Sequence, residues 1–239
     1  MKQALLTMLL VGSAFAQTKS TATTTAKSTA PPKAAAPKPN LLNPASLNAV
    51  APAEFDVKFT TTKGDILFHI TKAWSPHGAD RFYNLVRAGF FTDVAFYRVI
   101  SGFMAQFGIN PDPKVTQAWL QADIKDDKPS QSNKRGRLTF AQTGAPNSRG
   151  TQLFINFKDN AGLDDKFAPI GEVTEGMSVV DSLYSGYGES GDMGGGGPAG
   201  SKIQMEGRPY LDRNFPKIDR ILSAKIVIPP PAPKPADAK

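Results

Sequence analysis

Hydrophobic and polar residues alternate on both sides of Lys63-Gly64. The stretch EFDVKFT (54–60) precedes this pair and DILFHI (65–70) follows it. Period-two alternation places successive side chains on opposite faces of a strand. A short break that contains glycine is typical of a hairpin turn, because glycine adopts the positive φ that tight turns need. The pattern predicts a β-hairpin with one buried face.

A helical pattern follows in SPHGADRFYNLVRAG (75–89), where apolar residues recur three and four positions apart. Ser75 is a favourable N-cap, Pro76 suits the first helical position and Gly89 suits the C-terminal end. A second, shorter helix is predicted in GMSVVDSLYSG (176–186). Between and after these helices, short apolar runs are bounded by turn residues and predict strands. These strands lie near residues 94–100, 103–108, 138–142, 152–157, 168–174 and 220–228.

The predicted strands do not alternate regularly with helices, so a wound parallel sheet does not fit. The pattern favours a mainly β protein, built as a closed antiparallel barrel with helices over its ends. Two long polar segments, 109–136 and 186–219, are expected to be surface loops, with contacts to a partner as the alternative.

The two ends of the chain differ in composition from its centre. Residues 17–53 are rich in Thr, Ala, Ser, Pro and Lys and predict a disordered linker, because they hold few apolar side chains to bury. Residues 229–239 form a proline-rich tail. The segment 54–228 is long enough for a single core and is expected to form one folded domain.

Residues 1–16, MKQALLTMLLVGSAFA, combine a lysine, a short apolar run and Ala-Phe-Ala. This is the pattern of a secretory signal peptide with cleavage after Ala16. The apolar run is too short to span a bilayer, so we favour a cleaved signal over a membrane anchor. No other stretch predicts a membrane span. We expect an exported bacterial protein, placed first in the periplasm, with secretion as the alternative.

The composition excludes several kinds of chemistry. The sequence has no cysteine, so disulfides, thiol catalysis and cysteine-ligated zinc are excluded. The net charge is +7, but the one dense basic cluster, Lys134 to Arg137, contains no aromatic residue. We therefore expect no nucleic-acid partner. We also expect a monomer.

Few residues could serve a metal site or a hydrolase. The only histidines are His69 and His77, too few for a histidine-based metal site and poor candidates for a Ser-His-Asp base. Gly186, Gly188 and Gly191 match the dinucleotide-binding spacing, but they follow a helix and run into four glycines. That context predicts a flexible loop. We expect neither a metal nor a cofactor.

The segment AFYRVISGFMAQFG (95–108) places one arginine inside an apolar run. A guanidinium is always charged and is costly to bury unpaired. On a strand, Phe96 and Arg98 share a face, and Gly102 permits a turn that brings Gln106 near Arg98. Two interpretations stay open from spacing alone. Arg98 is either the strong donor of an apolar groove or a strand-face arginine paired with an acid across the sheet.

Three blocks of the sequence, in the right order, resemble the cyclophilin peptidyl-prolyl isomerases. FYRVISGFMAQFG (96–108) is similar to the family pattern F-H-R-V-I-x-G-F-M-x-Q-G-G, and LTFAQTGAPNSRGTQLFIN (138–156) and LDDKFAPIGEVTEGMSVVDSL (163–183) are similar to two further family blocks. The resemblance implies an eight-stranded antiparallel barrel capped by two helices. It also implies a cofactor-free enzyme that catalyses rotation about X-Pro bonds of polypeptides and assists the folding of exported proteins.

The resemblance assigns roles to individual positions. Arg98 would stabilise the twisted bond at the prolyl nitrogen, and Gln106 would orient Arg98. Phe167 stands where the family has a histidine, so it would close the pocket without donating a hydrogen bond. The substrate-binding residues implied are Phe96, Phe103, Met104, Ala141, Gln142, Gln152, Phe154, Leu163 and Phe167. For the apolar members, a place in the core is the alternative.

Two other functions compete with catalysis. The first is a proline-peptide-binding or chaperone module of the envelope that does not turn over substrate. Retention of Arg98 and Gln106 argues against it, because binding alone needs neither residue. The second is a tethered interaction protein that acts through its basic, proline-rich tails.

Overall fold

The computed structural model describes residues 40–227. Within them, nine strands form one antiparallel sheet in the order β3-β9-β1-β2-β8-β6-β7-β5-β4. The strands lie close to the predicted positions: β1 (Glu54–Thr61), β2 (Gly64–Thr71), β3 (Val94–Ala95), β4 (Arg98–Ile100), β5 (Met104–Phe107), β6 (Arg137–Phe140), β7 (Leu153–Asn156), β8 (Pro169–Glu175) and β9 (Arg220–Val227). The prediction of a mainly β fold is confirmed.

The predicted barrel of eight strands is not closed. The sheet ends at β3 on one side and at β4 on the other. Only Phe96 and Tyr97 separate these two strands, which the sequence predicted as one strand. The segment changes partners here, because residues 94–95 pair with β9 while residues 98–100 pair with β5. The result is a curled nine-stranded sheet whose two end strands are consecutive in the chain.

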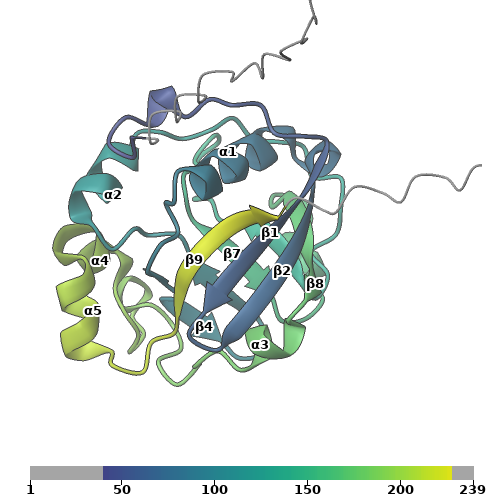
Figure 1. The fold of residues 1–239 in the computed structure, drawn as a ribbon. Helices are drawn as coiled ribbons and strands as arrows, with labels where there is room; N and C mark the ends of the chain where they lie inside the picture. The colour runs from purple at the N-terminus through teal and green to yellow at the C-terminus, as the bar shows by residue number, and fades with distance from the viewer. Residues whose placement is uncertain (1–39, 228–239) are drawn as a thin grey trace, which may run out of the picture. The chain divides into compact units, whose positions relative to one another are not determined.

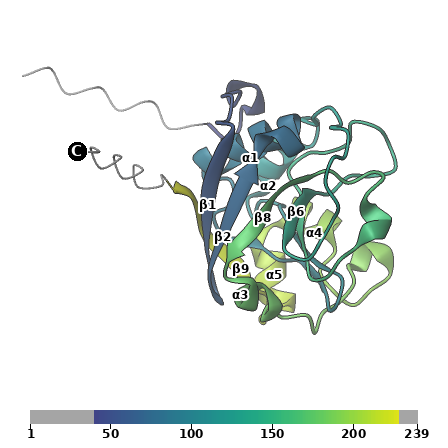
Figure 2. The ribbon, with the colours of Figure 1, turned by 90° about the vertical axis from the view of Figure 1, so that its right-hand side faces the viewer.

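Five α-helices accompany the sheet in the described part of the chain: α1 (Pro76–Arg87), α2 (Pro113–Trp119), α3 (Met177–Asp181), α4 (Gly200–Glu206) and α5 (Arg208–Asn214). The two predicted helices are α1 and a shortened α3, and they lie at opposite ends of the sheet (Figures 1 and 2). The other three lie in segments predicted to be surface loops, so that prediction is wrong. Among residues 40–227, no helix is both long and apolar enough to cross a membrane.

The main core is rich in aromatic rings. Phe59 of β1 lies at its centre, and its ring centroid is 5.0–6.1 Å from those of Phe68, Phe82, Phe91 and Phe107. Phe82 comes from the predicted apolar stripe of α1. Edge-to-face and tilted pairs at these distances add to the stability that burial alone provides. Val99 of β4 and Phe107 of β5 belong to this core, which therefore positions the two strands that carry Arg98 and Gln106.

A second, smaller core joins the C-terminal helices to the sheet. Tyr97 and Ile109 pack there with Ile203 of α4 and with Tyr210 and Leu211 of α5. Helices of seven residues are unstable in isolation and depend on such packing. The segment 186–219 is therefore part of the folded domain.

Residues 40–53 also belong to the domain, although the sequence predicted a disordered linker up to residue 53. The indole of Trp119 donates to the carbonyl of Leu41 (2.9 Å), and the amide of Asn84 donates to the carbonyl of Ala49 (2.7 Å). These contacts compensate for the low apolar content of the segment. The predicted signal peptide, the linker up to residue 39 and the tail (229–239) lie outside the described residues.

The start of α1 is capped by a residue far away in sequence. Ser75 stands at the predicted N-cap position, but its hydroxyl donates to Asp127 (2.5 Å). Asp127 accepts the backbone N–H groups of His77 (3.1 Å) and Gly78 (2.9 Å). It also accepts from the guanidinium of Arg149, which is 1% exposed (3.0 Å). Asp127 thus ties α1 to the loop that leads into β7.

Candidate active site

Arg98 lies on β4 opposite Gln106 of β5, as the turn at Gly102 predicted. Its Nη1 donates to Gln106 Oε1 (3.1 Å) and lies 3.8 Å from the sulfur of Met104. Gln106 Nε2 in turn donates to Gln152 Oε1 (3.1 Å). Four predicted site residues thus form a connected group. The side chain of Arg98 is 16% exposed, so its guanidinium can still meet a ligand.

The opposite edge of the guanidinium is paired with Glu189. Arg98 Nη2 donates to Glu189 Oε2 (2.9 Å), and Nε donates to Oε1. The hydrogen bond from Arg98 lowers the pKa of Glu189, although burial opposes the shift. The interpretation of Arg98 as an arginine paired with an acid therefore applies. The groove interpretation applies as well, because Arg98 also lines a cavity, described below.

Tyr97 completes the polar group from the other side. Its hydroxyl donates to Gln152 Oε1 (2.6 Å), so this oxygen accepts from both Tyr97 and Gln106. Burial raises the pKa of Tyr97, which keeps the phenol protonated and able to donate. Sequence reasoning missed Tyr97, because the strand was predicted to continue without a break through this position.

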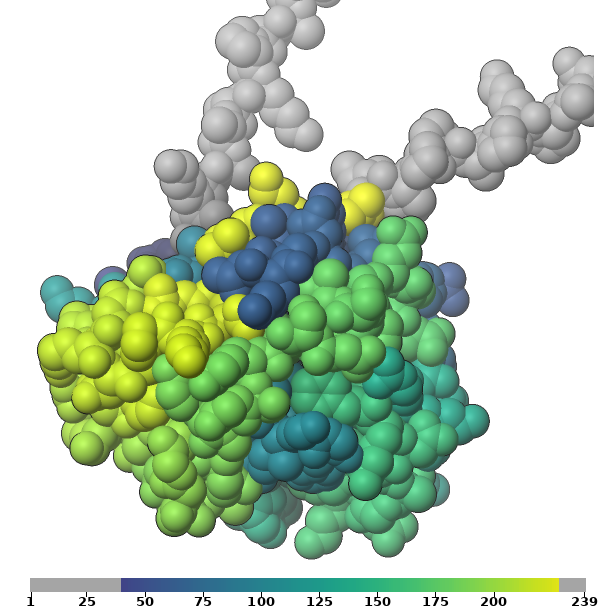
Figure 3. Space-filling model, turned by 90° about the horizontal axis from the view of Figure 1, so that it is seen from below, coloured from purple at the N-terminus to yellow at the C-terminus, as the bar shows by residue number. Residues whose placement is uncertain are grey.

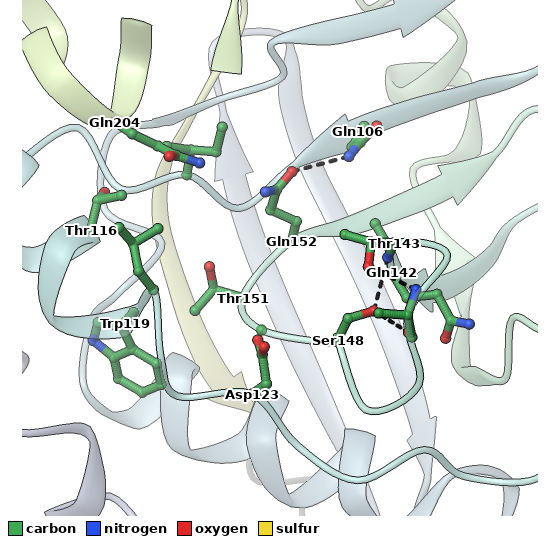
Figure 4. Close-up of a pocket in the computed structure, with 15 residues that line it drawn as sticks. Gln106, Thr116, Trp119, Asp123, Gln142, Thr143, Ser148, Thr151, Gln152 and Gln204 are labelled. Carbon is green, nitrogen blue, oxygen red and sulfur yellow. Dashed lines mark hydrogen bonds between the residues drawn. The ribbon is translucent and has the colours of Figure 1, made fainter. Parts of the chain in front are cut away.

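A cavity of about 530 Å³ adjoins this group. Gln106, Ala141, Gln142 and Gln152, all predicted site residues, line it. Figure 4 shows that the opposite side is formed by α2 and α4, through residues that the sequence did not indicate. The lining residues that were missed are Ile109, Thr116, Trp119, Leu120, Asp123, Thr143, Ala145, Ser148, Gly150, Thr151 and Gln204. Six of them lie in the segments predicted as surface loops, 109–136 and 186–219, where no periodic pattern marked them. The other five lie in 143–151, between two predicted strands.

A smaller cavity of about 220 Å³ lies directly at Arg98. Tyr97, Gln106 and Gln152 line it together with Ser190 and Met193 of the C-terminal segment. In the space-filling view, the dark teal patch of residues around 100 is flanked by the yellow-green C-terminal segment (Figure 3). The segment 186–219 therefore supplies one wall of the groove.

Of the predicted apolar residues, Met104 lies on β5 and Phe154 lies on β7. Phe103 comes just before β5, and Leu163 and Phe167 lie between β7 and β8. The rings of Phe154 and Phe167 meet edge to face, with centroids 5.8 Å apart. Phe154 on β7 is the cross-strand neighbour of Gln106 on β5, which places the two rings next to the strands that carry Arg98 and Gln106. The N–H of Phe167 donates to the carbonyl of Leu163 (2.9 Å). Met104 and Phe154 are buried, while Phe103, Leu163 and Phe167 are half-buried.

Phe96 packs in the main core and lines neither cavity, which favours the core alternative for this residue over a substrate-binding role. It is 2% exposed and packs edge to face on Phe107 of the core, with centroids 5.4 Å apart. The regular alternation that placed Phe96 and Arg98 on one face fails because the strand breaks between β3 and β4.

Residues 56–200 match the family model described as "Cyclophilin type peptidyl-prolyl cis-trans isomerase/CLD". The chain belongs to the cyclophilin family. This cyclophilin is 35% identical over 136 residues to "Peptidyl-prolyl cis-trans isomerase B" of Escherichia coli (strain K12), a match that covers 53% of this chain and 82% of that protein. It is also 35% identical over 138 residues to "Peptidyl-prolyl cis-trans isomerase cyp18" of Streptomyces antibioticus, which covers 53% and 81%.

Solved structures show the same fold. A cyclophilin-type isomerase of Cryptosporidium parvum superposes with a TM-score of 0.54 at 19% identity, covering 74% of this chain and 99% of that one. Cyclophilin AquaCyp293 of Hirschia baltica gives 0.53 at 20% identity, covering 76% and 78%. The family and its relatives establish the activity: this cyclophilin is a peptidyl-prolyl cis-trans isomerase (EC 5.2.1.8).

Proposed function

We propose that this cyclophilin isomerises X-Pro bonds of exported polypeptides, with Arg98 as the catalytic donor and Gln106 as its partner. The observation that carries the proposal is the position of the Arg98 guanidinium. It borders the groove, it is fixed by Gln106, and it lies beside the predicted proline-binding residues.

The chemistry needs no nucleophile, because no covalent bond is made or broken. Resonance gives the peptide C–N bond a rotation barrier of ~18–20 kcal/mol. As the bond twists, the prolyl nitrogen gains lone-pair character and becomes a hydrogen-bond acceptor. An N–H of Arg98 directed at that nitrogen stabilises the twisted state more than the planar one. Only such a differential interaction accelerates the reaction.

Other residues hold the peptide on either side of the bond. Phe103, Met104 and Phe154, with Leu163 and Phe167, offer an apolar surface for the proline ring. The larger cavity lies on the other side of Gln106 and would hold the residues of the substrate peptide that precede the proline. Ala141, Gln142 and Gln152 line it, and the N–H of Ala141 already donates to the carbonyl of Gln152 (2.9 Å).

Refolding of a protein with a native cis-proline tests the proposed action on polypeptides. Uncatalysed isomerisation limits such refolding to tens of seconds or longer at 25 °C. We expect catalytic amounts of the full chain to accelerate this slow phase without changing the fast phases, as followed by fluorescence. If equimolar chain only suppresses aggregation and leaves the slow phase unchanged, the protein is a chaperone module instead.

Export is proposed from the pattern of residues 1–16. When the full gene is expressed in a Gram-negative host, we expect the protein in the periplasmic fraction with Gln17 at its N-terminus, as read by intact mass. An Ala16→Arg variant should keep its leader, because the cleavage site needs a small residue there. Recovery of the uncleaved wild-type chain from the cytosolic fraction would contradict export.

A further inference from the structure

We propose that Glu189 is a positioning residue that fixes the guanidinium of Arg98 in its catalytic orientation. The inference rests on the proposed role of Arg98. Glu189 contacts Nε and Nη2, while Gln106 contacts Nη1. The guanidinium is thus held along two of its edges, and the remaining N–H groups are left for the substrate.

The position of Glu189 follows from the sheet. β4 is the last strand in the sheet order, so one of its edges has no strand beside it. Gly188 forms an isolated antiparallel bridge with Val99 on this edge. In an antiparallel pair, the residue after Gly188 faces the residue before Val99, which places Glu189 opposite Arg98. Cross-strand neighbours at this spacing are close enough for a direct ion pair.

The loop that carries Glu189 is held by its own backbone hydrogen bonds. The N–H of Gly197 donates to the carbonyl of Glu189 (2.8 Å), and the N–H of Gly195 donates to the carbonyl of Ser190 (3.0 Å). Ser190 Oγ donates to the carbonyl of Pro198 (2.9 Å). A Cβ on Gly195 or Gly197 would collide with the carbonyl of Glu189, so this close approach requires glycine. The backbone of the glycine-rich segment 194–197 therefore holds Glu189 in place.

The carboxylate itself is also fixed. The backbone N–H of Ser190 donates to Glu189 Oε1 (2.8 Å). Glu189 therefore accepts hydrogen bonds from its own loop and from Arg98, which orients both of its oxygens. Bidentate carboxylate–guanidinium pairs are stronger and more directional than single contacts. Such bidentate pairs fix the orientation of a guanidinium better than a single point charge does.

The pairing of Arg98 with Glu189 should affect the catalytic step more than it affects peptide binding. An arginine side chain has several rotatable bonds, and a free guanidinium spends only part of its time in any one orientation. Holding it in the reactive geometry removes that entropic cost from the transition state. The prolyl nitrogen of the planar substrate accepts no hydrogen bond, so the affinity for the peptide should depend little on the pairing of Arg98 with Glu189.

Kinetics of the full chain test this prediction with Glu189→Ala and Glu189→Gln. We expect kcat for an Ala-Pro peptide to fall about tenfold in Glu189→Ala while KM stays within about twofold. Glu189→Gln, which keeps one acceptor oxygen, should restore part of kcat. Asp181→Ala is the matched control, because it removes the bidentate partner of Arg135 elsewhere on the surface. It should leave both constants unchanged.

A second readout does not depend on activity. The Nε–Hε resonance of Arg98 should be resolved and slow to exchange with water in the wild type, and should shift or broaden in Glu189→Ala. If Glu189→Ala keeps the wild-type kcat and resonance, Glu189 has no positioning role. If it raises kcat or tightens peptide binding, Glu189 competes with the substrate, and the proposal is wrong. If the wild type is inactive but its Arg98 Nε–Hε resonance is resolved and slow to exchange, the catalytic role of Arg98 is overturned. The positioning of the Arg98 guanidinium by Glu189 is then retained.

Discussion

Arg98→Ala is expected to lower kcat/KM for an X-Pro peptide by about tenfold to one hundredfold. A hydrogen bond from a charged donor contributes about 1.5–3 kcal/mol, and each tenfold in rate corresponds to about 1.4 kcal/mol. Arg98→Lys should also lose most of the activity. A lysine keeps the charge, but it cannot bind Glu189 and Gln106 through a planar fork while it donates to the substrate.

The measurement is steady-state isomerisation of a proline peptide, with thermal unfolding of each variant to verify the fold. Arg135→Ala is the matched control. Arg135 is also ion-paired, through Asp181, and lines neither of the two cavities at the site. We expect it to retain wild-type kcat/KM. Equal losses in Arg98→Ala and Arg135→Ala would indicate a general charge effect on the peptide and would contradict a specific role for Arg98.

Asp127→Ala is expected to lower the free energy of unfolding by about 3 kcal/mol, the lower end of the range for breaking a buried ion pair. The variant leaves Arg149 buried without its best partner. It also removes the acceptor of Ser75 and of the first N–H groups of α1. Urea unfolding measures the loss. A change below about 1 kcal/mol would show that the network is not a major source of stability.

Asp126→Ala is the matched control for that variant. Asp126 Oδ1 lies 3.7 Å from Arg149 Nε, but its side chain is 39% exposed, so we expect a loss below about 1 kcal/mol.

The pH dependence of stability gives a second check on the role of Asp127. Burial opposes ionisation of Asp127, but hydrogen bonds from Ser75 and from α1, with the charge of Arg149, lower its pKa overall.

The lowered pKa of Asp127 sets the sign of the pH effect. Its contribution to stability is fully present above the pKa of an unfolded aspartate, about 3.9, and is lost as the pH falls through the lower folded pKa. We therefore expect wild-type stability to fall more steeply than that of Asp127→Ala below about pH 4. Parallel pH profiles would contradict the lowered pKa.

Local patterns predicted the elements that are long or repetitive. The β1–β2 hairpin and α1 were predicted because their apolar residues recur over several periods, and the structure buries those residues. α2, α4 and α5 have seven residues each, too few to produce a clear helical period. Their stability comes from tertiary packing, which no local pattern records.

The residues of the candidate site also fall into two groups, those that the local sequence predicted and those that it did not. Arg98 and Gln106 are eight residues apart on strands joined by one turn, so the sequence alone brought them together. Glu189 is 91 residues from Arg98 in sequence, and only the sheet register places it there. Phe96 was misplaced and Tyr97 was missed for one reason, because the strand changes partners between them and Arg98.

The central claim is that Arg98 stabilises the twisted peptide and not the planar one. NMR exchange spectroscopy at saturating Ala-Pro peptide measures the cis–trans rate in the bound state, and a titration gives Kd for the same sample. For Arg98→Ala against the wild type, we predict a bound-state rate lower by about tenfold or more with Kd within about threefold. A wild-type chain that binds the peptide without accelerating exchange, or a variant that loses affinity by the same factor as rate, would contradict the claim.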